Sequence, residues 1–330
     1  MNKSTNQTRI GIVETLRGLA AVSVCLFHFA SNNITFLGNS KIYPSLVEYG
    51  WLGVEAFFVL SGFIIPYSMI KSGYRIKDFF KFFAKRCLRI EPPYLLSILL
   101  VVLLAYLSSR APGFKGQEFK IDLGQLVSHA AYLPEHLGYN WLSPVYWSLE
   151  AEFHYYILIG LSISFLWKSK WTLLIGFILG WAASFYIHLY VFSGMQFFIM
   201  GIAVAAYKTE RMRLYEVYLV VLGSVAVCIL RGQPLVMPLV SAVVAFLLCH
   251  SHFRTKITDF LGKISFSLYL LHVPIGGRIV NFGGRYADTG LKVWAVILTA
   301  LMVSIAASYL FYLVIEAPSQ RLSKKINYSR

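Results

Sequence analysis

One apolar segment, approximately residues 12–31, carries an arginine and a histidine at a spacing that suits chemistry. Arg17 and His28 lie 11 residues apart, which in an α-helix leaves them about 20° from eclipsed and about 16 Å apart along the axis. A guanidinium binds anions, and a neutral imidazole is the usual general base near neutral pH. Two alternatives need no chemistry: an arginine that extends to lipid headgroups, and a histidine hydrogen-bonded between helices. Glu14 adds a third ionisable group.

A second candidate site is a pair of arginines at the end of a basic segment. Residues 71–89 contain seven Lys and Arg side chains, and the last two, Arg86 and Arg89, are three apart and would share a helix face. Paired guanidinium forks suit a polyphosphate. The alternative is a cluster that binds lipid headgroups. Pro92 and Pro93 follow directly and are expected to break the helix there, which favours a shaped site.

Three further apolar segments hold polar groups that need partners. Glu55 lies six residues before Ser61-Gly62, and this small pair would let a neighbouring backbone approach closely. Segment 145–167 begins with two carboxylates and a histidine within five residues, which are costly unless they face a cavity or water. His272 lies deep in the segment 260–280, where a structural hydrogen bond is the expected role.

Composition assigns these segments to a membrane. Of the 330 residues, 57% are apolar and 14% are charged, whereas soluble domains carry about 25% charged residues. The mean hydropathy of +0.63 agrees. A soluble enzyme, a disordered chain and a disulfide-stapled secreted domain are therefore excluded. The net charge of +15 indicates cytoplasmic loops and anionic headgroups rather than nucleic acid. Four scattered cysteines argue against a metal cluster, and no nucleotide-binding, zinc-protease or serine-hydrolase motif is present.

The expected fold is an all-α polytopic bundle of about ten spans, formed by residues 1–330 as one integral-membrane domain with a core of about 10–320. With the N-terminus in the cytoplasm, 21 of the 30 Lys and Arg residues fall on the inner side and eight on the outer, which predicts that both termini are cytoplasmic. The first span is expected to be retained rather than cleaved. The predicted helices are approximately 12–31, 50–70, 90–109, 145–167, 171–190, 193–207, 214–230, 233–250, 260–280 and 291–315.

Taken together, these residues resemble membrane-bound acyltransferase family 3, bacterial enzymes that O-acylate polysaccharides and related envelope molecules. The resemblance runs in order from about residue 10 to 320, with two mild departures, at Tyr155 and Phe266. The chain resembles the stand-alone type, without a periplasmic hydrolase-like domain. The motifs that carry the resemblance are Arg17-x10-His28, Gly53-Val54-x-x-Phe57-Phe58-Val59-Leu60-Ser61-Gly62-Phe63, Arg86-x-x-Arg89, Trp147-Ser148-Leu149-x-x-Glu152-x-x-Tyr155-Tyr156, Ser265-x-Ser267-Leu268-Tyr269-Leu270-x-His272-x-Pro274 and Glu316-x-Pro318.

The resemblance implies transfer of an acyl group, most often acetyl, from acetyl-CoA to a sugar hydroxyl, in the bacterial inner membrane and without a metal. His28 would activate the hydroxyl, with an acyl-histidine as a variant, and Arg17 would hold the donor or stabilise charge. Glu152 would orient His28 or bind the acceptor. The remaining expected site residues are Arg86 and Arg89 for coenzyme A, and Glu55, Ser61, Trp147, Ser148 and His272 for substrate or structural support.

The expected partners are the acyl-CoA donor, a glycan acceptor that is lipid-linked, such as an O-antigen or exopolysaccharide repeat, and membrane lipids. No nucleic acid is expected. The main rival is a secondary transporter, which would use His28 as a proton relay and would be expected to show internal repeats; none is evident. A protein that only passes the acyl group across the membrane to a separate acceptor enzyme is the other alternative.

Overall fold

The structure is a computed structural model that describes residues 11–31, 45–110 and 120–328. Every regular element within these ranges is helical, and none is a strand, which confirms the all-α prediction. Each predicted segment contains a helix. The main helices are α1 (Gly11–Ser31), α3 (Gly53–Lys71), α4 (Phe79–Ser109), α6 (Tyr146–Leu166), α7 (Lys170–Tyr186), α9 (Met195–Lys208), α10 (Leu214–Leu230), α11 (Val236–His250), α12 (Lys256–Leu271) and α14 (Gly290–Phe311).

Shorter elements connect or extend these helices: α2 (Ser45–Glu48), α5 (Leu123–Ala130), α8 (Tyr190–Ser193), α13 (Gly277–Gly283) and α15 (Ala317–Lys324). Four helical stretches of the described chain are long and apolar enough to cross a bilayer, namely Gly11–Ser31, Gly50–Lys71, Ile76–Ser109 and Gly290–Lys324. Three shorter apolar helices are α9, α10 and α11. The total of about ten spans and the cytoplasmic termini remain predictions.

Helix α4 differs from the sequence prediction. It begins at Phe79 instead of about residue 90, so Arg86 and Arg89 lie within it, and it continues through Pro92 and Pro93. The expected break at these prolines is therefore wrong. Adjacent prolines remove only two backbone donors from a helix of 31 residues, and apolar helices tolerate such a loss when neighbouring groups satisfy the freed carbonyls.

Two π-helical turns interrupt helices that the sequence predicts as continuous. His272–Gly276 separates α12 from α13, and Tyr312–Glu316 separates α14 from α15. A proline lies inside the first turn and another follows the second at Pro318. A π-turn widens the helix locally and changes the direction of its side chains, and such turns are frequent at functional sites.

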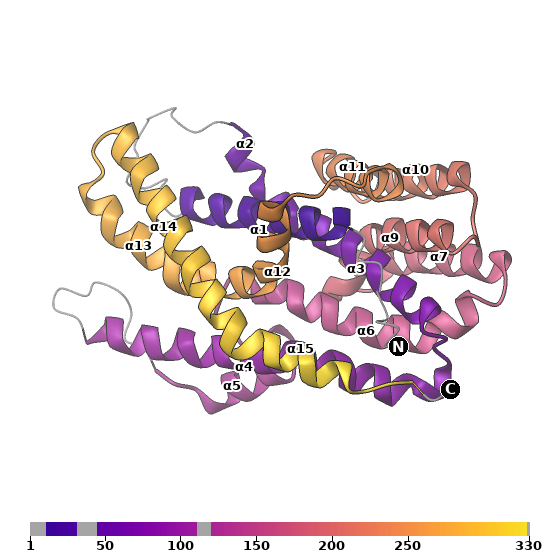
Figure 1. Ribbon diagram of the computed structural model, residues 1–330, viewed down its shortest axis with the longest axis horizontal. Coiled ribbons are helices and arrows are strands. Elements are labelled where there is room, and N and C mark those ends of the chain that lie inside the picture. Colours follow the sequence, from indigo (N-terminus) through magenta and orange to yellow (C-terminus); the bar gives the residue numbers. More distant parts are fainter. Residues whose placement is uncertain (1–10, 32–44, 111–119, 329–330) are drawn as a thin grey trace, which may run out of the picture.

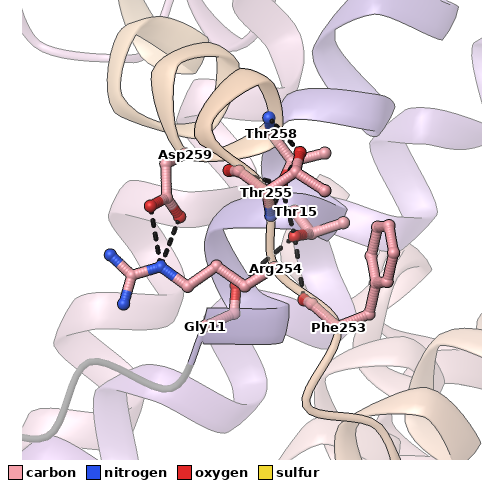
Figure 2. Close-up of polar contacts among 7 residues, drawn as sticks. All are labelled: Gly11, Thr15, Phe253, Arg254, Thr255, Thr258 and Asp259. Carbon is pink, nitrogen blue, oxygen red and sulfur yellow. Dashed lines mark hydrogen bonds and ion pairs between the residues drawn. The ribbon is translucent and has the colours of Figure 1, made fainter.

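Helices α1 and α12 form a closely packed parallel pair. Figure 2 shows their N-terminal ends joined by Thr15, whose hydroxyl bonds Thr258 Oγ1 at 2.9 Å and the Phe253 carbonyl at 3.1 Å. One turn further on, the pair is too close for a side chain: a Cβ at Gly262 would lie 2.2 Å from the Glu14 carbonyl oxygen. This register brings the C-terminal ends of both helices together at His28 and His272.

A second close contact joins α3 to α9. A Cβ at Gly62 would lie 2.2 Å from the Phe198 carbonyl oxygen, and one at Gly201 would lie 2.1 Å from the Val59 carbonyl oxygen. The predicted close backbone approach at Ser61-Gly62 is therefore confirmed, and it fixes the face on which Ser61 lies. On another side of the bundle, α15 lies alongside the first half of α4 (Figure 1).

Candidate functional site

One pocket is lined by most of the polar residues that the sequence analysis named as candidates. Helices α1, α3, α4, α6 and α12 line it, and the empty space at the pocket, including the part open to solvent, measures about 830 Å³. Its polar lining consists of three arginines, three serines, a carboxylate and two tyrosines: Arg17, Arg86, Arg89, Ser61, Ser148, Ser265, Glu152, Tyr156 and Tyr269. The rest of the wall is apolar, with Phe57, Phe58, Ile64, Ile90 and Phe266 among its members. We call it the arginine pocket.

The three guanidinium groups of the arginine pocket form no direct ion pair within the described residues. Arg17 comes from α1, whereas Arg86 and Arg89 come from one face of α4. No carboxylate of the described residues lies within 4.0 Å of any of the three. The Arg86 guanidinium lies 5.4 Å from the Phe82 ring centroid and 5.5 Å from that of Tyr156. Such faces orient the charge and leave its N–H groups for an anion.

Glu152 faces the arginine pocket, and neutral donors hold it. Its Oε1 accepts a hydrogen bond from Ser61 Oγ at 2.8 Å and another from the Tyr156 hydroxyl at 2.5 Å. Tyr156 is four residues along the same helix, and Ser61 is fixed on α3 by the α9 contact. Within the described residues, Glu152 makes no hydrogen bond to His28, so its geometry suits the pocket wall rather than orientation of the imidazole.

Glu316 supplies a second fixed carboxylate beside the same arginines. It is 2% exposed and ends the second π-turn. Its Oε2 accepts from Ser267 through the backbone N at 3.2 Å and Oγ at 2.5 Å, and its Oε1 accepts from Gln320 Nε2 at 2.8 Å. Because neutral donors occupy both oxygens, Glu316 acts on Arg17 and Arg89 through its field, without a direct ion pair.

His28 lies outside the arginine pocket, toward the opposite end of α1, and pairs with His272. The His28 Nδ1 atom lies 2.9 Å from the Val24 carbonyl oxygen and 3.3 Å from His272 Nε2. The two rings are 5.1 Å apart between centroids. His272 is fully buried, and its Nδ1 lies 3.1 Å from the Leu268 carbonyl oxygen. We call these two side chains the histidine pair.

Tyr269 connects the two regions. It lines the arginine pocket, and its ring centroid lies 5.9 Å from that of His272 and 5.7 Å from that of Phe57. Its hydroxyl is held by Ser148 Oγ at 2.6 Å and donates to the Val145 carbonyl at 3.1 Å. Ser148 thus belongs to the pocket wall and fixes the tyrosine that stands between pocket and histidines.

Other predicted site residues lie apart from this pocket. Glu55 is 4% exposed, and its Oε2 has no hydrogen-bond partner among the described residues. Trp147 packs at 6.2 Å from Phe58 and 5.3 Å from Tyr190 between ring centroids, which makes it a support behind the pocket wall. Glu55 and Trp147 are not among the lining residues.

The two carboxylates of α6, Glu150 and Glu152, are two residues apart and face different regions of the molecule. Two positions along an α-helix differ by about 200° in direction, so Glu150 faces away from Glu152. Glu150 Oε1 lies 3.1 Å from His136 Nε2 and 3.8 Å from His154 Nδ1. In the described chain, no group of three His, Cys, Asp or Glu side chains could hold a metal ion.

Four further residues of this region occur in the sequence motifs given above, but the sequence assigned no role to them. Tyr156 and Ser267 hold the two carboxylates, Glu316 is one of those carboxylates, and Tyr269 separates the pocket from the histidine pair. The i, i+4 spacing of Glu152 and Tyr156 was a usable signal, because it places the phenol over the carboxylate. The Ser267–Glu316 contact joins residues 49 apart and has no local signal.

Comparison with known proteins identifies the family of the chain. The profile of the acyltransferase domain family matches residues 10–313. The chain is 31% identical to ORF330 of Acidianus two-tailed virus, named as an acetyltransferase, over 51% of this chain and 45% of that protein. It is 24% identical to O-acetyltransferase OatA of Staphylococcus aureus, over 94% of this chain and 57% of OatA. It is 25% identical to acyltransferase MdmB of Streptomyces mycarofaciens, over 95% of this chain and 92% of MdmB.

The chain thus spans about half the length of the first two relatives. No solved structure was found to match it. The family profile covers most of the chain, from residue 10 to residue 313. The chain therefore belongs to the membrane-bound acyltransferase family 3.

Proposed function

We propose that this chain is a membrane O-acetyltransferase that moves an acetyl group from acetyl-CoA to a sugar hydroxyl of a cell-envelope polysaccharide, with His28 as general base. The proposed acceptor is a lipid-linked glycan, such as an O-antigen or exopolysaccharide repeat. The proposed location is the bacterial inner membrane. The name of OatA, an O-acetyltransferase, supports the acetyl group and the hydroxyl acceptor.

The observation that carries the proposal is the arginine pocket. Arg17, Arg86 and Arg89 meet there with no carboxylate of the described chain within ion-pair distance. Three cations that line one pocket repel one another, so a polyanionic ligand that binds there would relieve this repulsion. Coenzyme A carries several phosphates and a long flexible arm. The apolar wall beside the arginines suits the arm, and the guanidinium forks suit the phosphates.

The distance along α1 suits the same donor. Arg17 and His28 are 11 residues apart, or about 16 Å along a helix. A donor whose phosphates are bound at the arginines would extend its thioester past Tyr269 toward the histidine pair. The acceptor hydroxyl would then meet the thioester near His28, toward the outer end of α1. In this arrangement one protein binds a cytoplasmic donor and an acceptor from the other side of the membrane.

The proposed reaction balances with His28 as the only proton carrier. His28 Nε2 takes the proton of the acceptor hydroxyl as the oxygen attacks the thioester carbonyl carbon. The tetrahedral intermediate collapses, the carbon–sulfur bond breaks, and the histidine returns its proton to the departing thiolate. Acetyl ester and free coenzyme A are the products. The residues present require no metal for these steps.

Mass spectrometry of envelope polysaccharide from cells that express the wild type, His28→Ala or His188→Ala tests the proposal. His188 is an exposed histidine and serves as the matched control. We expect one added acetyl per repeat with the wild type and with His188→Ala, removable by mild base, and none with His28→Ala.

Acetylation by all three proteins would overturn the assignment of His28. If none of them acetylates the polysaccharide, the proposed acceptor is wrong. Transfer of label from acetyl-CoA to the protein without any acetylated glycan would instead favour a translocator that supplies a separate acceptor enzyme.

A further inference from the structure

The hydrogen bonds of the histidine pair determine where its protons lie. A carbonyl oxygen can only accept, so the contact of His28 Nδ1 with the Val24 carbonyl at 2.9 Å places a proton on Nδ1. The contact of His272 Nδ1 with the Leu268 carbonyl at 3.1 Å does the same for the second ring. In two neutral imidazoles, both Nε2 atoms are then unprotonated.

This assignment gives the contact between the rings a direction. His272 Nε2 carries a lone pair and lies 3.3 Å from His28 Nδ1. The Nδ1 proton of His28 is therefore shared between the Val24 carbonyl and His272. The basic nitrogen of His28 that remains is Nε2, the atom that a general base needs.

The surroundings hold His272 in this orientation. It is fully buried and begins the π-turn His272–Gly276 at the end of α12. The rings of Phe29 and Tyr269 lie at 6.2 Å and 5.9 Å from its ring between centroids. Within the described chain, neither histidine makes an ion pair with a carboxylate. A neutral imidazole thus occupies the place where a carboxylate often orients a catalytic histidine.

We propose that His272 is a positioning residue that, as a second acceptor beside the Val24 carbonyl, orients the Nδ1 proton of His28 and leaves Nε2 as the basic nitrogen. When Nε2 takes the proton of the acceptor hydroxyl, the Nδ1–H bond to His272 stabilises the imidazolium, and His272 itself gains and loses no proton. This inference rests on the proposed role of His28, and it adds a residue that touches neither donor nor acceptor.

Two amide substitutions separate this role from packing. In His272→Gln the side-chain oxygen takes the place of Nε2 and can accept from His28. In His272→Asn the amide takes the place of Nδ1, so it can donate to the Leu268 carbonyl but offers nothing to His28. Both variants keep a polar side chain in a buried site, and thermal unfolding in detergent checks that both remain folded.

We expect His272→Asn to lower the rate of transfer about 100-fold, because the His28 imidazolium loses one of the two acceptors of its Nδ1 proton. His272→Gln should stay within about tenfold of the wild type, and the affinity for coenzyme A should be unchanged in both. Equal rates in the two variants would overturn the proposal, as would a rate for His272→Asn equal to that of the wild type.

A spectroscopic measurement tests the tautomer without any transfer assay. In protein with ¹⁵N-labelled histidine, the His28 signals are assigned by their loss in His28→Ala. We expect a protonated Nδ1 and an unprotonated Nε2 in all three proteins, with the Nδ1 signal shifted in His272→Asn because the proton loses one of its two acceptors. A protonated Nε2 on His28 in the wild type would overturn the inference. Absence of acetyl transfer by the wild type would instead count against the proposed function. The ¹⁵N measurement of the His28 tautomer would still test the role of His272.

Discussion

The arginine pocket and the histidine pair both depend on α1, yet their polar groups are satisfied in opposite ways. In the pocket, three guanidinium groups have no carboxylate of the described chain within ion-pair distance, while Glu152 and Glu316 are held by hydroxyl, amide and backbone donors. In the histidine pair, each ring donates its one proton to a backbone carbonyl. The pocket thus offers guanidinium groups without a direct ion pair, whereas the histidine pair offers one basic nitrogen.

This difference has a physical consequence for each region. Three cations without a direct ion pair repel one another, so an anionic ligand gains more there than at a site where each cation is paired. The histidine pair is neutral and fully hydrogen-bonded apart from Nε2 of His28, so it can stay buried at low cost. Ligand binding and proton transfer should therefore be separable by mutation.

The largest expected effect follows from His28→Ala. Removal of a general base lowers kcat about 10²- to 10⁴-fold, and coenzyme A affinity should be unchanged because His28 does not line the arginine pocket. Single-turnover transfer and calorimetric titration of coenzyme A measure the two quantities separately. Loss of binding in this variant would show that the two regions are one site.

Arg89→Ala should show the converse pattern. A hydrogen bond to a charged group contributes about 1.5–3 kcal/mol, so we expect coenzyme A to bind about 10- to 150-fold more weakly, with a smaller effect on kcat. Arg89→Lys should recover part of the affinity, since it keeps the charge but loses the fork. Arg285→Ala, at an exposed arginine, is the control, and an equal effect there would indicate nonspecific attraction.

Gly62→Ala should disturb the pocket through its scaffold. The new Cβ would meet the Phe198 carbonyl oxygen at 2.2 Å, and overpacking of this kind typically costs about 1–3 kcal/mol of unfolding free energy. Gly176→Ala is a matched control, because the Cβ there meets only the flexible end of Leu166. Thermal unfolding in detergent compares the two, and similar midpoints would contradict the close α3–α9 contact.

The smallest expected effect is that of Asp259→Asn. This residue pairs with Arg254 at 2.7 Å, in a contact that is largely exposed at the N-terminal end of α12 (Figure 2). Exposed ion pairs contribute about 0.2–1 kcal/mol, and salt screens them. We expect a small, salt-dependent decrease in stability and unchanged transfer. A large loss of transfer would mean that this end of α12 controls the histidine pair.

Sequence reasoning located the helices well because an apolar run long enough for a bilayer is a strong local signal. It failed at α4, where the effect of Pro92 and Pro93 depends on neighbours that satisfy the backbone, and it missed both π-turns. The shared face of Arg86 and Arg89 was predictable from their spacing, and both line one pocket. The close approach of another helix backbone at Gly62 was predictable from the Ser61-Gly62 pair, but the identity of that helix, α9, was not.

The sequence by itself determined the membrane class, the positions of the helices and the residue types available for chemistry, because these follow from composition and short-range periodicity. Only the tertiary structure decided which groups meet. The contacts Ser61–Glu152, Ser267–Glu316 and His28–His272 join residues 91, 49 and 244 apart. Such pairs depend on which helices pack closely. That depends on steric fit at positions such as Gly62 and Gly262, and no local pattern encodes which helix supplies the partner.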